Sequence, residues 1–213
     1  MNFKSILISI LVIFLTSTIA SAQTDINVVV GGGFGGIAYK NSEGLGISKE
    51  ERVNGFGFNH MAEWYFSEIL GIGLRQTAFI ASNDLEINEA DYSETTTVSS
   101  LMMTLHLILF GSDSWARFGI TSGYGRSAYR YQLDTDEDES ENADDEEYTG
   151  SGDAYLVGAF LDWGGDGFGM RFGYDYFQTD FDTFDTEVNE TETRDVDLSG
   201  TGDYVYLNFR YAW

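Results

Sequence analysis

The chain ends in the stretch Tyr204-Val205-Tyr206-Leu207-Asn208-Phe209-Arg210-Tyr211-Ala212-Trp213. Side chains of an extended strand alternate between two faces, so the odd-numbered residues from Val205 to Trp213 share one face. That face is wholly apolar or aromatic, whereas the opposite face carries Asn208 and Arg210. In a soluble protein the charged face meets water, but in a transmembrane barrel the apolar face meets lipid and the polar face meets the lumen. The stretch therefore predicts a barrel strand that crosses a membrane.

Seven further segments show the same two-residue alternation. With the last one, they span approximately residues 26–40, 52–66, 69–82, 97–110, 115–131, 153–163, 168–181 and 201–213. Three connections, around 67–68, 111–114 and 164–167, are short, rich in Gly, Asp and Ser, and typical of hairpin turns. The other four, 41–51, 83–96, 132–152 and 182–200, are longer and strongly polar. Short turns at one rim and long loops at the other predict an all-β fold, an eight-stranded antiparallel up-and-down transmembrane β-barrel with both termini in the periplasm.

The first 22 residues have the features of a secretory signal peptide. Lys4 supplies a positive start, residues 6–15 are almost continuously apolar, and Ala20-Ser21-Ala22 fits a cleavage site. The apolar core is shorter than the roughly 20 residues that a membrane-spanning helix needs. We therefore expect residues 1–22 to be a removed signal peptide and residues 23–213 to be one barrel domain.

The composition excludes nucleic acid as a partner. The chain has 11 basic and 35 acidic residues and a net charge of −24. Removal of residues 1–22 takes away one lysine and no acid, which leaves −25, and this charge repels phosphate backbones. The chain has no cysteine, which excludes disulfides and thiol chemistry. Export without disulfides favours a bacterial envelope protein.

Charged residues on the inward faces predict an ion-pair network inside the barrel. The lumen of an eight-stranded barrel is just wide enough for its own side chains to fill, and an unpaired buried charge is costly. The expected members are Glu63, Arg75, Arg117, Asp162, Arg171, Asp175 and Arg210. Such a network fits a structural plug, and a gated ion path is the alternative.

The register of segment 52–66 is ambiguous. Phe58, Trp64 and His60 fall on one face, although a neutral imidazole is costly in lipid. A β-bulge near Asn59 would turn His60 inward, and the sequence leaves both registers open. Six aromatic residues near the short turns are expected to form a periplasmic aromatic girdle: Trp64, Phe66, Trp115, Trp163, Phe168 and Trp213.

Residues 134–147 contain ten acidic residues in fourteen positions. Asp134, Asp136 and Asp138 have the spacing of calcium ligands in an EF-hand, but Glu139 replaces the required glycine. We therefore expect no dedicated metal site and only weak, non-specific divalent cation binding. Cation bridging to lipopolysaccharide phosphates would be one use of this segment.

Catalytic options are few because the chain has only two histidines, His60 and His106. Barrel enzymes that act on lipid A need a histidine with a serine and an acid near the outer leaflet. His106 has no neighbouring serine on its face, and a pairing of His60 with Ser122 or Ser127 has no support in the sequence. We expect no catalytic residues, no cofactor and no enzymatic activity.

The signal peptide, the eight segments, the unequal connections and the terminal Tyr211-Ala212-Trp213 together resemble the small bacterial outer-membrane β-barrel superfamily, of the OmpX and OmpA-transmembrane type. The resemblance implies an outer-membrane location, with Phe209, Tyr211 and Trp213 as the C-terminal signal for the barrel-assembly machinery. It implies contact with outer-membrane lipid and lipopolysaccharide, and a structural, surface-interaction or adhesion role in which the acidic extracellular loops meet an extracellular ligand. The alternatives are a narrow porin-like channel for small solutes or ions, a lipid-modifying enzyme, and a soluble exported barrel that holds an apolar ligand.

Overall fold

The computed structural model describes residues 25–40, 52–87, 90–111, 115–135, 146–164, 167–188, 190–194 and 198–213. The predicted signal peptide and connection 41–51 lie outside these residues. Among the residues described, no helix is long and apolar enough to cross a bilayer. The strands are β1 (Asp25–Lys40), β2 (Arg52–Tyr65), β3 (Leu70–Ile87), β4 (Ala90–Phe110), β5 (Ala116–Thr135), β6 (Glu146–Gly164), β7 (Gly167–Val188), β8 (Glu190–Arg194) and β9 (Leu198–Ala212).

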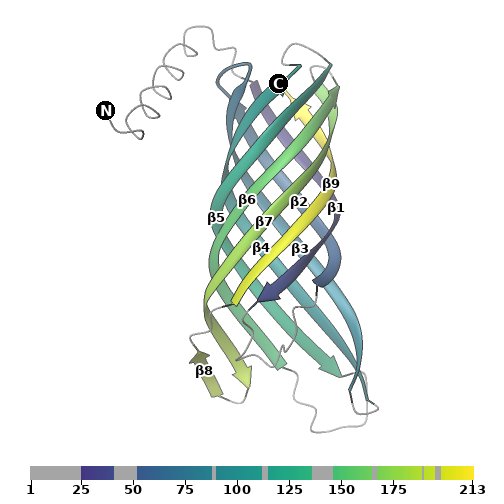
Figure 1. Cartoon of the computed structure of the whole chain (residues 1–213), viewed down its shortest axis with the longest axis vertical. Coiled ribbons are helices and arrows are strands. Elements are labelled where there is room, and N and C mark those ends of the chain that lie inside the picture. Colours follow the sequence, from purple (N-terminus) through teal and green to yellow (C-terminus); the bar gives the residue numbers. More distant parts are fainter. Residues whose placement is uncertain are drawn as a thin grey trace, which may run out of the picture.

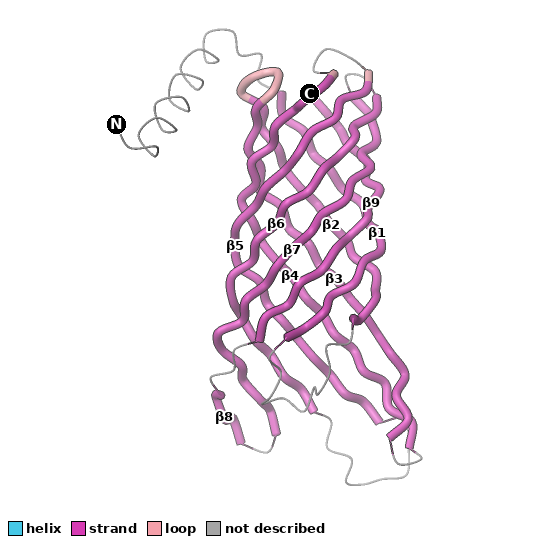
Figure 2. Tube along the Cα trace, in the orientation of Figure 1, coloured by secondary structure: helices cyan, strands magenta, loops and turns pink. Residues whose placement is uncertain are grey.

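Eight of these strands close into an antiparallel barrel (Figure 1). Each strand from β1 to β7 pairs with the next one, and β9 lies between β7 and β1. At the closing seam Ile26 and Trp213 exchange two backbone hydrogen bonds, at 3.1 and 3.2 Å. β8 pairs only with β7 and extends beyond the barrel wall (Figure 2). The predicted eight-stranded up-and-down barrel is confirmed.

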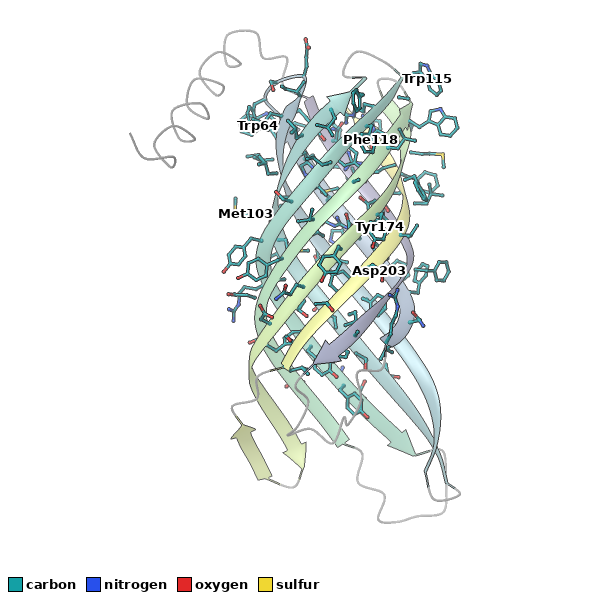
Figure 3. The ribbon with its side chains drawn as sticks, in the orientation of Figure 1. Trp64, Met103, Trp115, Phe118, Tyr174 and Asp203 are labelled. Carbon is teal, nitrogen blue, oxygen red and sulfur yellow. The ribbon has the colours of Figure 1, made fainter. Side chains whose placement is uncertain are left out.

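The side chains are distributed in the opposite way to those of a soluble domain. On β4, Met103 is 70 % exposed on the outer face, whereas His106 is 1 % exposed on the inner face. Figure 3 shows outward side chains such as Met103 and Tyr174 along the wall. Arg171 and Arg210 are 0 % and 6 % exposed. The structure thus has apolar rows on the outside and these arginines in the lumen.

One rim of the barrel carries tight turns and aromatic side chains. Gly164 and Gly167 have φ angles of 127° and 89°, which residues with a Cβ rarely adopt, so the turn between β6 and β7 depends on glycine. Trp64 and Trp115 lie close to this rim (Figure 3). The outward aromatic residues near the rim are Trp64, Phe110, Trp115, Trp163, Phe168, Tyr211 and Trp213.

At the other rim the strands continue beyond their predicted ends. β3 and β4 stay paired as far as Ile87 and Ala90, and β7 continues into a hairpin with β8. The predicted long loops 83–96, 132–152 and 182–200 were therefore wrong in extent, because much of each is strand (Figure 1). Polar and acidic residues dominate these connections, which favoured loops, although Leu85 and Ile87 alternate with Asp84 and Glu86 as in a strand.

The structure decides the register of β2. Pairing with both neighbours is continuous from Phe56 to Tyr65, so the alternative of a bulge near Asn59 was wrong. His60 is exposed on the outer face, where its Nε2 lies 2.9 Å from Oε1 of Gln76. Among the described strand pairs, register shifts occur near Leu109 of β4 and at the Ser151–Gly152 step of β6.

Candidate functional site in the barrel interior

Arg171, on β7, is the centre of a charged cluster in the lumen near the short-turn rim. Its Nε donates a hydrogen bond to Oδ1 of Asp162 at 2.5 Å, and its NH2 donates to Oδ2 of Asp162 at 2.9 Å. The same guanidinium donates two bonds to Glu63, one of them from NH2 to Oε2 at 3.0 Å. Glu63 is on β2 and Asp162 is on β6, and these strands lie on opposite sides of the barrel. Arg171 thus connects two carboxylates across the lumen with bidentate, charge-assisted bonds.

Two more arginines converge on Asp162. Nε of Arg117 lies 2.8 Å from Oδ2 of Asp162, and Nε of Arg210 lies 3.9 Å from the same oxygen. Arg210 also donates from NH1 to Oδ1 of Asn27 at 3.3 Å. Both carboxylates of the cluster are therefore compensated, and each is at most 1 % exposed.

Aromatic rings complete the packing around the guanidinium groups. Arg171 lies over the ring of Phe160 at 4.1 Å and Arg117 lies over the ring of Tyr65 at 4.7 Å. Cation–π contacts of this kind strengthen when the cation is desolvated. The cluster is thus a solid layer of ions and rings that fills this part of the lumen.

Arg75 and Asp175 form a separate ion pair farther from the short-turn rim. Nitrogen NH2 of Arg75 lies 2.5 Å from Oδ2 of Asp175, and both side chains are 1 % exposed. The Arg75 guanidinium also lies 5.2 Å from the ring of Tyr206. The seven predicted members of the network are all inward, but they are divided between this pair and the Arg171 cluster.

A polar chain next to the cluster was missed by the sequence analysis. Oγ1 of Thr104 lies 2.8 Å from Nε2 of His106, whose Nδ1 lies 3.5 Å from Oε1 of Glu63. The order hydroxyl, imidazole, carboxylate is that of a nucleophilic triad. However, Thr104 and His106 are 4 % and 1 % exposed, and Glu63 is already bound by Arg171. Thr104 and His106 are two residues apart, which places them on one face, but contact with Glu63 depends on closure of the barrel.

A second missed feature is an amide contact that passes over a glycine. Gly31 of β1 lies directly between Asn59 of β2 and Asn208 of β9. Because Gly31 has no side chain, Nδ2 of Asn208 reaches across it and donates to Oδ1 of Asn59 at 2.6 Å. Nearby, the hydroxyl of Tyr204 donates to the carbonyl of Gly57 at 2.7 Å. Glycines on β1 thus allow side chains from the two flanking strands to meet inside the barrel.

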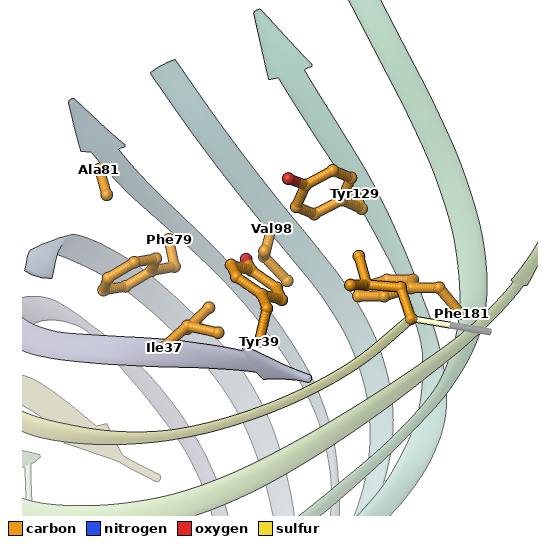
Figure 4. Packing of buried hydrophobic residues seen from close by; sticks show 8 residues of the cluster. Ile37, Tyr39, Phe79, Ala81, Val98, Tyr129 and Phe181 are labelled. Atoms are coloured by element: carbon orange, nitrogen blue, oxygen red, sulfur yellow. The ribbon is translucent and has the colours of Figure 1, made fainter. Parts of the chain in front are cut away.

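An apolar cluster, here called the outer plug, fills the lumen toward the long-hairpin rim. Within it, the ring of Tyr129 lies 5.5 Å from that of Tyr39 and 5.4 Å from that of Phe181. A cavity of about 30 Å³ separates the plug from the Arg75–Asp175 pair, which is room for one or two water molecules. The outer plug consists of Ile37, Tyr39, Phe79, Ala81, Val98, Tyr129, Phe181 and Leu198, each at most 5 % exposed (Figure 4).

The remaining predicted sites lie elsewhere. Asp134 is at the end of β5, and Asp136 and Asp138 lie outside the described residues. Within the part of the chain that is described, no group of three or more His, Cys, Asp or Glu residues has the arrangement of a metal site. Phe209, Tyr211 and Trp213 lie on the outward row of the last strand, with exposed fractions of 67 %, 42 % and 61 %.

The same fold occurs in solved bacterial outer-membrane proteins. A major outer membrane protein from Thermus thermophilus is 12 % identical, with a TM-score of 0.58 over 89 % of this chain and 99 % of that chain. The attachment invasion locus protein Ail of Yersinia pestis, solved with the heparin analogue sucrose octasulfate, is 11 % identical, with a TM-score of 0.51 over 88 % of this chain and 98 % of that chain. No family and no curated protein matches the sequence. The chain therefore has the fold of the small eight-stranded outer-membrane barrels.

Proposed function

We propose that this protein is an integral barrel of the bacterial outer membrane that fills its own lumen and presents β-hairpins at the cell surface. The observation that carries the proposal is the apolar outer wall. Outward residues such as Met103, Phe172 and Phe209 are 70 %, 55 % and 67 % exposed, and a soluble protein rarely exposes a continuous apolar surface of this extent. In a bilayer this wall faces lipid, and the tryptophans at the short-turn rim lie at the membrane interface.

Membrane fractionation with gel electrophoresis tests this placement. We expect the protein to remain in the outer-membrane fraction after carbonate washing and to require detergent for extraction. In cold detergent the folded barrel should migrate differently from the boiled chain, because its strands stay paired. Release by carbonate, or identical migration before and after boiling, would contradict an integral barrel.

The interior supports a barrel that does not conduct. The Arg171 cluster fills the lumen near one rim and the outer plug fills it near the other. We expect no reproducible open levels when the purified protein is inserted into planar bilayers. Discrete open levels, selective for small ions, would favour the alternative of a narrow channel.

The charge of the chain supports a surface role that differs from binding of sulfated sugars. The net charge is −24, and ten acidic residues fall within positions 134–147. Like charges disfavour an anionic ligand such as sucrose octasulfate and favour a basic partner or bridging divalent cations. Titration of the full-length protein in nanodiscs with Ca²⁺ should give weak binding, which decreases when Asp134, Asp136 and Asp138 are all changed to Asn. Tighter binding of sucrose octasulfate than of Ca²⁺ would contradict this role.

A non-enzymatic role also fits both histidines. His106 is enclosed in the lumen with Thr104 and Glu63, and His60 lies on the outer wall against Gln76. Neither histidine borders the cavity between the plug and the Arg75–Asp175 pair. Mass spectrometry of lipid A from cells with and without the protein should show the same acyl pattern. A change that disappears with His60→Ala or His106→Ala would establish an enzyme.

A further inference from the structure

A polar pair lies near the middle of the apolar wall on β2 and β3. On β2 the outward residues between the two rims are Trp64, Ala62, His60, Phe58 and Phe56, so His60 is the central one. Its direct partner across the strand pair is Gln76 of β3, whose outward neighbours are Leu74 and Ala78. With about 3.3 Å per residue along a strand tilted by roughly 40°, His60 lies roughly 10 Å from the level of Trp64. The pair is therefore near the middle of the proposed membrane belt.

The two side chains satisfy only part of each other's hydrogen bonding. Nε2 of His60 and Oε1 of Gln76 are 2.9 Å apart, and both side chains are exposed. This bond uses one ring nitrogen of His60 and one end of the amide of Gln76. Among the described contacts, the second ring nitrogen of His60 and the other end of the Gln76 amide have no hydrogen-bond partner. Lipid tails cannot bond to either group, and polar groups at this depth are costly.

We propose that the outward face of β2 and β3 is the contact between two copies of this chain in the membrane. The inference rests on the proposed membrane location. A neutral imidazole has one donor nitrogen and one acceptor nitrogen. Whichever way the Gln76 amide is turned, the second ring nitrogen of His60 and the free end of that amide therefore supply one acceptor and one donor next to each other. A two-fold axis along the membrane normal, between β2 and β3, places His60 of each copy opposite Gln76 of the other. The hydrogen-bonding groups that remain free in one copy then pair with those of the other copy.

The shape of the wall fits such a contact. One outward neighbour of each polar residue is an alanine, Ala62 beside His60 and Ala78 beside Gln76. Small residues allow two membrane-embedded surfaces to approach closely, which strengthens both packing and hydrogen bonds. Other strands carry large side chains on their outward rows, among them Met103 and Phe172, at 70 % and 55 % exposed. On β2 and β3, a low centre that contains a hydrogen-bonded polar pair is thus flanked by larger side chains.

Cysteine cross-linking in native membranes tests the proposal, because the chain has no cysteine of its own. Ala62→Cys and Ala78→Cys each place a thiol beside the polar pair. Ser122→Cys is the matched control, since Ser122 is an exposed, small, polar residue on the outward row of β5. On oxidation with copper phenanthroline, we expect a product of twice the chain mass from the first two variants and monomer from the control. Adding His60→Leu and Gln76→Leu should reduce the product several-fold, while apolar leucines keep the wall compatible with lipid.

Each other outcome overturns a different part of the inference. Cross-linking no stronger than in the Ser122→Cys control, in a protein that still needs detergent and still migrates as a folded barrel, would exclude the dimer and leave the membrane location intact. A product of a different mass would identify another membrane protein as the partner. A dimer that persists in the double leucine variant would show that His60 and Gln76 do not form the contact.

Discussion

Arg171 is the side chain on which the charged layer depends, because it alone bridges Glu63 and Asp162 across the lumen among the described contacts. Replacement of Arg171 removes the guanidinium partner of Glu63, whose side chain is 0 % exposed. Removing one partner of a buried ion pair typically costs about 3–5 kcal/mol. We expect Arg171→Met to lower the free energy of unfolding by about this amount, measured by urea titration in detergent micelles with tryptophan fluorescence.

Arg126→Met is the matched control for this substitution. Arg126 also pairs with an aspartate, Asp153, at 2.9 Å, but the two side chains are 65 % and 32 % exposed on the outer wall. Exposed pairs contribute about 0–1 kcal/mol. Equal losses in the two variants would show that enclosure of the Arg171 cluster does not determine its contribution.

Gly31 tests the contact that crosses β1. A Cβ at this position would meet the carbonyl oxygen of Leu207 and the side chain of Asn208. Overpacking at a tight site costs about 1–3 kcal/mol. We expect Gly31→Ala to lower the temperature at which the folded gel band is lost, because the Asn59–Asn208 hydrogen bond is displaced.

Gly123→Ala provides the comparison, since the nearest atom to its added Cβ is Cγ2 of Thr104 at 3.1 Å. A methyl group there requires only a small movement of a side chain. The prediction fails if the two alanine variants lose their folded bands at the same temperature.

At the scale of the strands, we expect the barrel to fold without the part of the β3–β4 hairpin that extends beyond it. β3 and β4 remain paired beyond Ser82 and Thr95, but the outer plug extends along β3 only to Ala81. We expect a variant in which residues 83–94 are replaced by Asn-Gly to fold into the same barrel, because this dipeptide favours a two-residue hairpin turn. The heat-dependent mobility shift on a gel should be retained. Its loss would mean that the extension is needed for the barrel itself.

The strands of the belt could be predicted from the sequence because lipid and lumen impose opposite demands on alternate residues. Leu101, Met103 and Leu105 alternate with Met102, Thr104 and His106, and the structure places the two sets on opposite faces. Around Thr95 and Thr97 both sides of the strand are polar, and the contrast disappears. The extension of β4 was therefore predicted as a loop.

The interior site could be predicted only in part. Alternation placed Glu63, Asp162 and Arg171 in the lumen, but their pairing depends on which strands face each other across the closed barrel. The contact of Asn59 with Asn208 depends in addition on Gly31 lying between them. The ion pairing across the lumen and the Asn59–Asn208 contact both depend on how separate strands are aligned. The sequence pattern of a single strand does not contain this information.

At the scale of the whole molecule, the lumen has two closures in series. The outer plug is apolar, whereas the Arg171 cluster is ionic and lies toward the opposite rim. We expect Tyr129→Ala combined with Phe181→Ala to leave the barrel non-conducting in planar bilayers, because the ionic layer still fills the lumen. Open levels in this variant, absent from the unmodified protein, would show that the plug alone closes the path.

The hydrogen bonds between Ile26 and Trp213 belong to the β1–β9 seam, which closes the barrel during folding. β1 is the first described strand of the barrel along the chain and β9 is the last, so one edge of β1 stays without its partner until β9 is present. An unpaired strand edge is a template for association with other chains, and pairing between such distant segments is slow. We therefore expect association between chains to compete with folding until β9 has paired with this edge of β1.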